Sequence, residues 1–405
     1  MERKRNHRVP TVACIISILF TYAATRGASE PNAALLYNQA FLLYEKPDDT
    51  MSKMLADFRF GRIESNQLIR EHIEKNHRVI DYVTTAASIP TCNWGYDYSQ
   101  GLDLVIPSHD YLMHMAFLLL TEARLLAEQG DAPTALDRIL TAYKMAMHSI
   151  DRPWTTYLIG QALACYTDRV TPGILPMASD NVEALSRLKA ELRRINDTFP
   201  PLAQGLTGEG EICAVSMRKE KAQTIIKLLE EDRDAESYRP LDGSRDERMI
   251  VRIREADDTF FEANRKHWLN SIAAMAAILE SRLPYPEMCA KLDAMDKQQC
   301  GATKDSPDGV LTAAAWPEVT RTYQLNTRLH TELNAIETAI DLYGARARTG
   351  RLPDMLPADA PLDLFTSQPF KYEKTADGFI LAGRDRKMLE RDKILWYQYE
   401  FKIKK

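Results

Sequence analysis

The sequence lacks the short motifs that mark many catalytic sites. It has no G-x-S-x-G nucleophile elbow, no G-x-x-x-x-G-K-[ST] phosphate loop and no G-x-G-x-x-G dinucleotide fingerprint. None of its six cysteines has C-x-x-C spacing, which excludes a zinc ribbon and a thioredoxin-type redox pair. A triad assembled from distant residues leaves no such signature, so these absences count against an enzyme without excluding one.

Glycine is scarce, proline is no more than average, and positive charge is in the minority. With 17 glycines and 20 prolines in 405 residues, most of the chain cannot be low-complexity linker. There are 52 lysines and arginines against 57 acidic residues, and no basic face stands out. We therefore expect no nucleic-acid partner. The 45% hydrophobic content is enough for real hydrophobic cores, and the length indicates two or three domains.

A long uncharged apolar run occurs at the N-terminus, over residues 9–25, after the basic stretch MERKRNHR. This order is typical of a secretory signal peptide or a short membrane anchor, which we place at residues 1–28. The run is shorter than the ~20 residues that a spanning helix needs. Cleavage after Ala23 fits the small-residue rule better than cleavage after Ala28, and whether it occurs stays open. We expect an exported protein, periplasmic or extracellular, that contacts a membrane only through this segment, with anchoring to the inner membrane as one possibility.

Beyond that segment, apolar residues recur at helical spacing, as in residues 33–44 and 66–88. Residues 108–150 predict a helical hairpin whose first helix ends at Gly130. Asp131 then caps the second helix, and Pro133 lies in its first turn. This pair is weakly tetratricopeptide-like, but no 34-residue repeat follows. The expected fold class is mainly α, built from antiparallel helical hairpins, with a first helical domain over residues 29–204.

Two polar stretches interrupt the helical pattern. Residues 205–247 are charge-dense and predict a solvated helix that runs into an exposed loop. Residues 296–312 are polar and predict irregular structure. We therefore expect residues 205–312 to form long helices with charged and irregular connections.

The last segment, residues 313–405, has the clearest pattern. A helix is expected to stop at Gly350, ahead of Pro353 and Pro357. Alternating apolar residues then flank Asp377–Gly378, which predicts a β-hairpin, and KILWYQYEFKI predicts a final strand. Together these features predict a small α+β unit that carries an antiparallel hairpin.

Five cysteines remain once Cys14 is assigned to the export segment, so they cannot all pair internally. Cys289 and Cys300 are close in sequence, which makes them the disulfide we expect if one forms. Unpaired buried thiols are the alternative.

The stretch CNWGYDYSQG, residues 92–101, has two interpretations. It supplies carboxylates near two histidines, which are candidates for an acid/base or metal site, namely Asp97, Asp103, His109 and His114. The histidines are five residues apart, however, and so do not stack on one helical face. In the other interpretation, which we favour, Trp94 and Tyr96 wedge against a helical core. No cofactor is expected, and a metal stays undetermined.

Two further sets have ordinary explanations. Methionines beside histidines in MHMAFLLL and KMAMH resemble a copper or haem ligand set, but methionine is also common core filler. Glu209 and Glu211, with the downstream READD stretch, resemble a glycosidase carboxylate pair. Since the chain holds 57 acidic residues, such pairs also arise by chance.

The stretch AIDLYGARARTGRLPDMLP, with the following PLDLFTSQPFKYEKTADGFILAGRD, resembles the C-terminal half of type II secretion major pseudopilins. The resemblance covers about residues 335–385 and implies a helix that leads into a small sheet. Leu364 stands where that family has proline, the calcium loop is missing after Gly383, and the N-terminal methylation signal is absent. The resemblance therefore implies shape, without filament assembly or calcium binding.

The whole chain also resembles uncharacterised secreted helical proteins of planctomycete-type bacteria, through NAALLYNQAFLLY and CNWGYDYSQG. This resemblance implies architecture but no activity. We expect a structural or interaction protein of the cell envelope, a scaffold with protein partners. The alternative is an extracytoplasmic hydrolase or metal-dependent enzyme with a site near residues 92–114.

Overall fold

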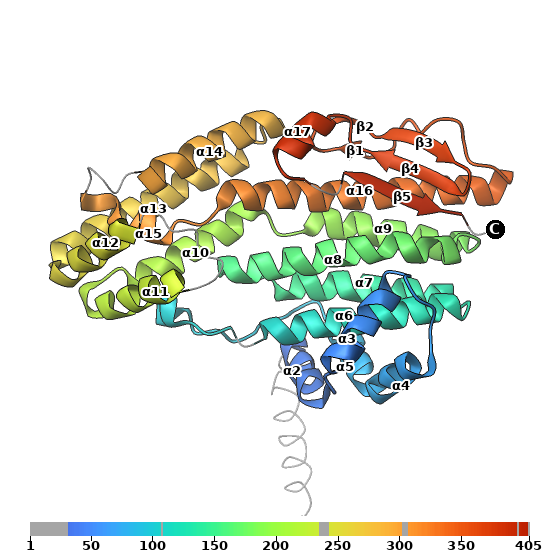
Figure 1. Cartoon of the computed structure of the whole chain (residues 1–405), viewed down its shortest axis with the longest axis horizontal. Helices are drawn as coiled ribbons and strands as arrows, with labels where there is room; N and C mark the ends of the chain where they lie inside the picture. The colour runs from blue at the N-terminus through green and yellow to red at the C-terminus, as the bar shows by residue number, and fades with distance from the viewer. Residues whose placement is uncertain (1–30, 107, 235–242, 302–306, 395–396, 404–405) are drawn as a thin grey trace, which may run out of the picture.

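The computed structural model describes residues 31–403, except positions 107, 235–242, 302–306 and 395–396. The expected export segment, residues 1–28, lies outside the described residues. Within the part that is described, no helix is long and apolar enough to cross a membrane. The chain is mainly helical with a small C-terminal antiparallel sheet, which confirms the expected fold class (Figure 1).

Four short helices form the N-terminal layer. An asparagine or aspartate side chain caps each of the first three by accepting a backbone N–H bond. The stretch 66–88 divides at Asn76 into two helices, because the buried Asn76 side chain donates to the His72 carbonyl, where the helix turns. The bounds are α2 (Ala33–Leu43), α3 (Asp49–Arg59), α4 (Gln67–Lys75) and α5 (His77–Ser88).

The middle of the molecule is a stack of long helices that run lengthwise (Figure 1). The predicted hairpin is confirmed: Gly130 adopts φ +88°, and the Asp131 carboxylate accepts the Thr134 N–H at 3.2 Å. Two further helices pack beside it. The buried side chains of the second of them, α9, are all apolar, whereas the first, α8, also buries polar residues such as Thr167 and Asp168. The bounds are α6 (His109–Glu128), α7 (Ala132–Ser149), α8 (Trp154–Ala178) and α9 (Val182–Thr198).

The stretch from residue 202 to residue 315 is more regular and better buried than predicted. Most of the first helix, expected to be solvated, is buried, because its small residues let neighbouring helices approach closely. Helix also extends into the stretch 296–312, which we predicted to be irregular. The bounds are α10 (Leu202–Ser216), α11 (Ala222–Asp234), α12 (Gly243–Glu255), α13 (Asp258–Glu280), α14 (Tyr285–Gly301) and α15 (Val310–Ala315).

The predicted Cys289–Cys300 disulfide is wrong. Both residues lie on α14, where eleven residues of helix separate them by about 16 Å along the axis. A disulfide requires Cα atoms within about 7 Å of each other, so an intact α14 keeps them apart.

The C-terminal unit has the expected parts. Helix α16 (Val319–Thr349) ends at Gly350, which adopts φ +77°, and the hairpin forms around Asp377–Gly378. The final strand pairs with the hairpin so that Phe379 faces Phe401 and Leu381 faces Tyr399. The remaining bounds are β1 (Leu362–Asp363), β2 (Gln368–Pro369), β3 (Lys371–Thr375), β4 (Gly378–Ala382), α17 (Arg386–Arg391) and β5 (Gln398–Lys402).

One apolar core joins these layers, from Ala33 in α2 to Phe401 in β5. Helix α16 packs along α8 and α9, and the sheet lies over α16 (Figure 1). The expected segment boundaries at 204/205 and 312/313 fall inside α10 and α15.

A buried polar cluster lies where α8, α16 and β5 meet. The Arg328 guanidinium and the Glu332 carboxylate form an ion pair at 3.4 Å, and the Tyr143 hydroxyl donates to the Asp168 carboxylate. Burial raises the pKa of Asp168 well above its ordinary value and that of Glu332 to about 7. The Tyr399 hydroxyl is buried in the same region.

Candidate functional site

Residues 92–103 form a pinned corner, which confirms the structural interpretation of CNWGYDYSQG. The Trp94 indole N–H donates to the His148 carbonyl at 2.7 Å, and the ring stacks on Tyr37 with centroids 5.7 Å apart. The Tyr96 hydroxyl lies 2.9 Å from the Ser108 hydroxyl. These contacts fix the loop against α2, α7 and the start of α6.

The same corner is tied to α10 at Gly101. This residue has φ +63°, and a Cβ there would lie 2.2 Å from the Ser216 hydroxyl oxygen. That oxygen accepts the Leu102 N–H at 2.8 Å. Only glycine fits, since both the backbone angle and the close approach exclude a side chain.

The two candidate carboxylates of this region have partners of their own. Asp97 accepts hydrogen bonds from the N–H and the hydroxyl of Ser99, and these bonds lower its pKa. Asp103 pairs with the Lys221 ammonium at 2.5 Å, which lowers the pKa of Asp103. In the charged form, Asp97 thus stabilises its own turn, and Asp103 ties the corner to the residue before α11.

The candidate histidines lie elsewhere. His109 is exposed at the first position of α6. His114 stacks on Tyr44 with centroids 5.6 Å apart and lines a separate pocket. No three His, Cys, Asp or Glu side chains among the described residues are grouped so that they could hold a metal ion.

The other sets have structural roles. Met115 and Met145 are fully buried in the core, as the core-filler interpretation predicts. Glu209 accepts the Trp154 N–H at 2.9 Å, while Glu211 forms an ion pair with Arg152. The two glutamates therefore hold the start of α8 against α10.

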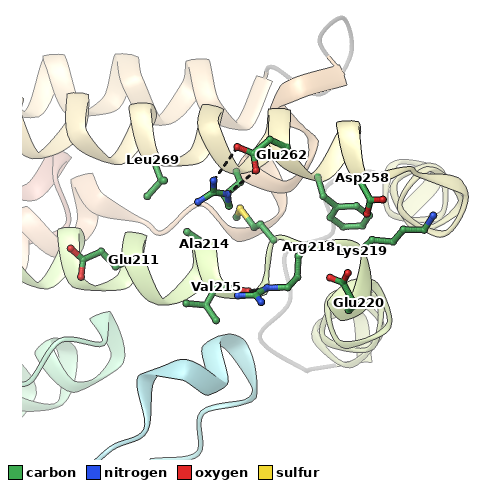
Figure 2. A pocket seen from close by; sticks show the side chains of 12 residues that line it. Glu211, Ala214, Val215, Arg218, Lys219, Glu220, Asp258, Glu262 and Leu269 are labelled. Carbon is green, nitrogen blue, oxygen red and sulfur yellow. Dashed lines mark hydrogen bonds and ion pairs between the residues drawn. The ribbon is translucent and has the colours of Figure 1, made fainter.

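A groove that sequence reasoning missed runs along α10, and we call it the α10 groove. It begins as a hollow of about 630 Å³ between α10 and α13 (Figure 2). Side chains of both signs line it, and the Arg265 guanidinium pairs with Glu262 at 3.0 Å, which lowers the pKa of Glu262. Its labelled charged residues are Glu211, Arg218, Lys219, Glu220, Asp258 and Glu262.

Two further hollows continue the groove. The second, about 780 Å³, shares Glu211 with the first, and the third, about 320 Å³, shares Arg282, Tyr323 and Asn326 with the second. His330 lines the third hollow, and burial lowers the pKa of this histidine to about 4. The groove thus passes from α10 and α13 to α16, and it is open to solvent along its length.

Glycines in α10 let neighbouring segments approach this helix closely, and one of them, Gly208, lines the second hollow. A Cβ at Gly208 would lie 2.2 Å from the Arg152 carbonyl oxygen, and one at Gly210 would lie 2.7 Å from Ile272. The buried Trp268 indole donates to the Gly210 carbonyl at 2.8 Å. The close approach of α10 to α13 therefore depends on Gly210, and its approach to the segment before α8 depends on Gly208. No motif in the sequence predicted either contact.

Backbone strain occurs at the far end of the groove. Arg282 and Ser367 both have positive φ, +50° and +54°, and both line the third hollow. Non-glycine residues adopt such angles at a cost, and they concentrate at binding and catalytic sites.

Comparison with known proteins adds no relative. No family model matches the chain, and no curated protein or solved structure is significantly similar to it. The class that the structure defines is a mainly helical protein with a C-terminal α+β unit. The two sequence resemblances stay predictions.

Proposed function

We propose that this is an exported cell-envelope protein that acts as a scaffold and holds an extended polypeptide segment of a partner in the α10 groove. The observation that carries the proposal is the groove itself, three adjoining hollows that are open to solvent. Export rests on the N-terminal sequence pattern.

The chemistry of the groove suits a polypeptide better than a small molecule. Small-molecule sites are mostly enclosed and apolar, whereas this groove is open and is lined by both acidic and basic side chains. Helix α10 alone spans about 22 Å along its axis, enough for six or seven extended residues. Arg282 and Arg152 offer donors to backbone carbonyls, and the Glu280 carboxylate offers an acceptor to N–H groups.

The test combines purification with site-specific crosslinking. A tag at Lys405, gentle solubilisation of native membranes and mass measurement should give a stoichiometric complex with an envelope protein. A photo-crosslinking amino acid in place of Thr207, within the groove, should form an adduct with that partner. The same amino acid in place of Glu183, exposed on α9, is the control and should form none.

A single monodisperse chain that yields no adduct from position 207 would overturn the proposal. Equal adducts from positions 207 and 183 would also count against it, since the contact would then be nonspecific. The alternative, a hydrolase or metal-dependent enzyme around residues 92–114, has less support because its candidate side chains do not converge: Asp97, Asp103 and His114 have separate partners, and His109 is exposed.

A further inference from the structure

A separate pocket, which shares no lining residue with the α10 groove, lies between α3, α4, α6 and α8. Its volume is about 400 Å³, within the range of small-molecule sites. Aromatic and aliphatic side chains form much of its wall, among them Phe117, Tyr166 and Leu118. We call it the Arg59 pocket, after the one buried arginine that lines it.

Arg59 is 5% exposed and is held by neutral groups. Its Nη1 donates to the Thr121 hydroxyl at 3.0 Å, and its Nε donates to the Tyr166 hydroxyl at 3.3 Å. The guanidinium carbon lies 4.7 Å from the centre of the Phe117 ring. These contacts fix the position of the charge without neutralising it.

No carboxylate compensates this charge. Arg59 forms no ion pair with any described residue, and none of the 13 residues that line the pocket is acidic. The second terminal nitrogen, Nη2, has no acceptor among the described residues. In a chain with more acidic than basic residues, an acid-free cavity around a buried cation is unexpected from composition. An uncompensated buried charge is costly, and an anion in the cavity would offset that cost.

Two histidines and a tyrosine near Arg59, namely His72, His114 and Tyr44, are neutral hydrogen-bonding groups. Burial lowers the pKa of His72, with Lys75 and Arg59 adding to the effect and Glu45 opposing it. The pKa of His114 is lowered in the same way, with Lys46 adding and Asp110 opposing. Burial raises the pKa of Tyr44 to about 12. At neutral pH these three side chains offer hydrogen-bond donors and acceptors, but no negative charge that would pair with Arg59 in place of a ligand.

We propose that the Arg59 pocket binds a small organic carboxylate with an apolar or aromatic body. The carboxylate lies against the free edge of the Arg59 guanidinium, and the body packs against the wall that Leu118 and the touching Phe117 and Tyr166 rings form, with the ring centroids 4.6 Å apart. Planar guanidinium groups match the two oxygens of a carboxylate.

The apolar wall distinguishes this ligand class from inorganic phosphate. A phosphate ion needs donors around all its oxygens, and the described lining offers Arg59 as its one buried cation, with Lys53 exposed at the surface. A benzoate-sized ligand instead uses both the charge and the aromatic surface.

Isothermal titration calorimetry on the full chain in mild non-ionic detergent tests this proposal, with benzoate, its neutral isostere benzamide, and phosphate as the probes. Benzoate should bind with one site per chain, and benzamide at least about tenfold more weakly, because it lacks the charge. Arg59→Gln should lower benzoate affinity about 10- to 100-fold. Arg62→Gln, just past α3 and exposed in an ion pair with Asp57, is the matched control and should bind as the wild type does.

A second variant keeps the proposal testable if Arg59→Gln does not fold. Ala56→Leu keeps the charge but fills part of the cavity, so it should also abolish benzoate binding while circular dichroism stays unchanged. No benzoate binding by the folded wild type at about 10 mM would overturn the proposal. Three other outcomes would also overturn the proposal. They are equal affinity for benzoate and benzamide, unchanged benzoate affinity in both pocket variants, and binding of phosphate but not of benzoate.

Discussion

Two buried arginines in this protein have opposite surroundings. Arg328, 7% exposed, lies in the packed seam between α8 and α16, pairs with Glu332 and has Asp168 nearby. Arg59, 5% exposed, has no acidic partner among the described residues and lines a cavity of about 400 Å³. Both side chains are equally removed from water, so burial alone does not distinguish them.

The difference teaches how to separate a structural charge from a binding charge. A buried charge that meets its counter-charge within a packed core is neutralised by the fold itself, even though Arg328 Nε and Glu332 Oε2 have no hydrogen-bond partner among the described residues. A buried charge that lacks a counter-charge and faces a cavity is compensated only by a ligand of opposite charge that enters the cavity. The predictions below test this contrast through stability, without any ligand.

The largest effect is expected for Arg328→Met. It leaves the Asp168 and Glu332 carboxyl groups buried without their nearest cation, so the free energy of unfolding at pH 8 should fall by about 3–5 kcal/mol. Urea-induced unfolding at pH 8 measures this change in the free energy of unfolding. Arg386→Met, which breaks an exposed pair with Glu390, is the control and should stay close to the wild type. Equal effects in the two variants would remove the structural role assigned to Arg328.

The next effect concerns pH. Burial raises the pKa of Glu332 from 4.5 to about 7, so between these values the folded state holds a proton that the unfolded chain has lost. Its contribution to stability is therefore full below about pH 4.5 and is lost as the pH rises through about 7. Relative to Glu332→Gln, which has no such proton, the wild type should lose on the order of 2 kcal/mol between pH 5 and pH 8. Parallel stability profiles of the two proteins would contradict this.

A pair of alanine variants compares the packing of the two sites. Ala164, 1% exposed on α8, is in the packed core, so Ala164→Leu should lower the free energy of unfolding by about 1–3 kcal/mol through overpacking. Ala56→Leu extends into the Arg59 pocket and should change it by less than about 0.5 kcal/mol. If both variants were equally destabilised, the pocket would not be open space.

The smallest effect is expected for Arg59→Met in ligand-free protein. The variant loses ring and hydrogen-bond contacts but also removes an uncompensated buried charge, so the two terms offset each other. The free energy of unfolding should change by less than about 1 kcal/mol in either direction. A loss as large as that of Arg328→Met would show that Arg59 is a structural residue.

Features with a local cause could be predicted from the sequence. The turn at Gly130–Asp131 and the helix end at Gly350 follow from a positive φ and a capping side chain, and the structure shows both. The hairpin at Asp377–Gly378 follows from turn chemistry and alternation. Where charge was used to infer exposure, as for residues 205–216, the prediction failed, because the glycines of α10 carry no hydrophobic pattern yet bring helices into contact.

The candidate site was less predictable. Asp97, Asp103, His109 and His114 are close in sequence, but the structure does not bring them together. Asp97, Asp103 and His114 contact separate partners, and His109 is exposed. His114 does line a pocket, beside Arg59 and His72, which lie 55 and 42 residues earlier in the chain. No local pattern connects residues from α3, α4 and α6, and so the sequence offered no route to this pocket.

By itself, the sequence determined the class of the fold and the ends of some of its elements, such as those at Gly130 and Gly350, since helix caps, glycine turns and apolar periodicity act within a few residues. Only the tertiary structure decided which helix faces meet. The packing of α16 against α8 buries Arg328 together with its partner Glu332, whereas the packing of α3 against α6 places Arg59 beside a cavity without acidic residues. The physical reason is that burial and electrostatic compensation depend on groups far apart in the chain.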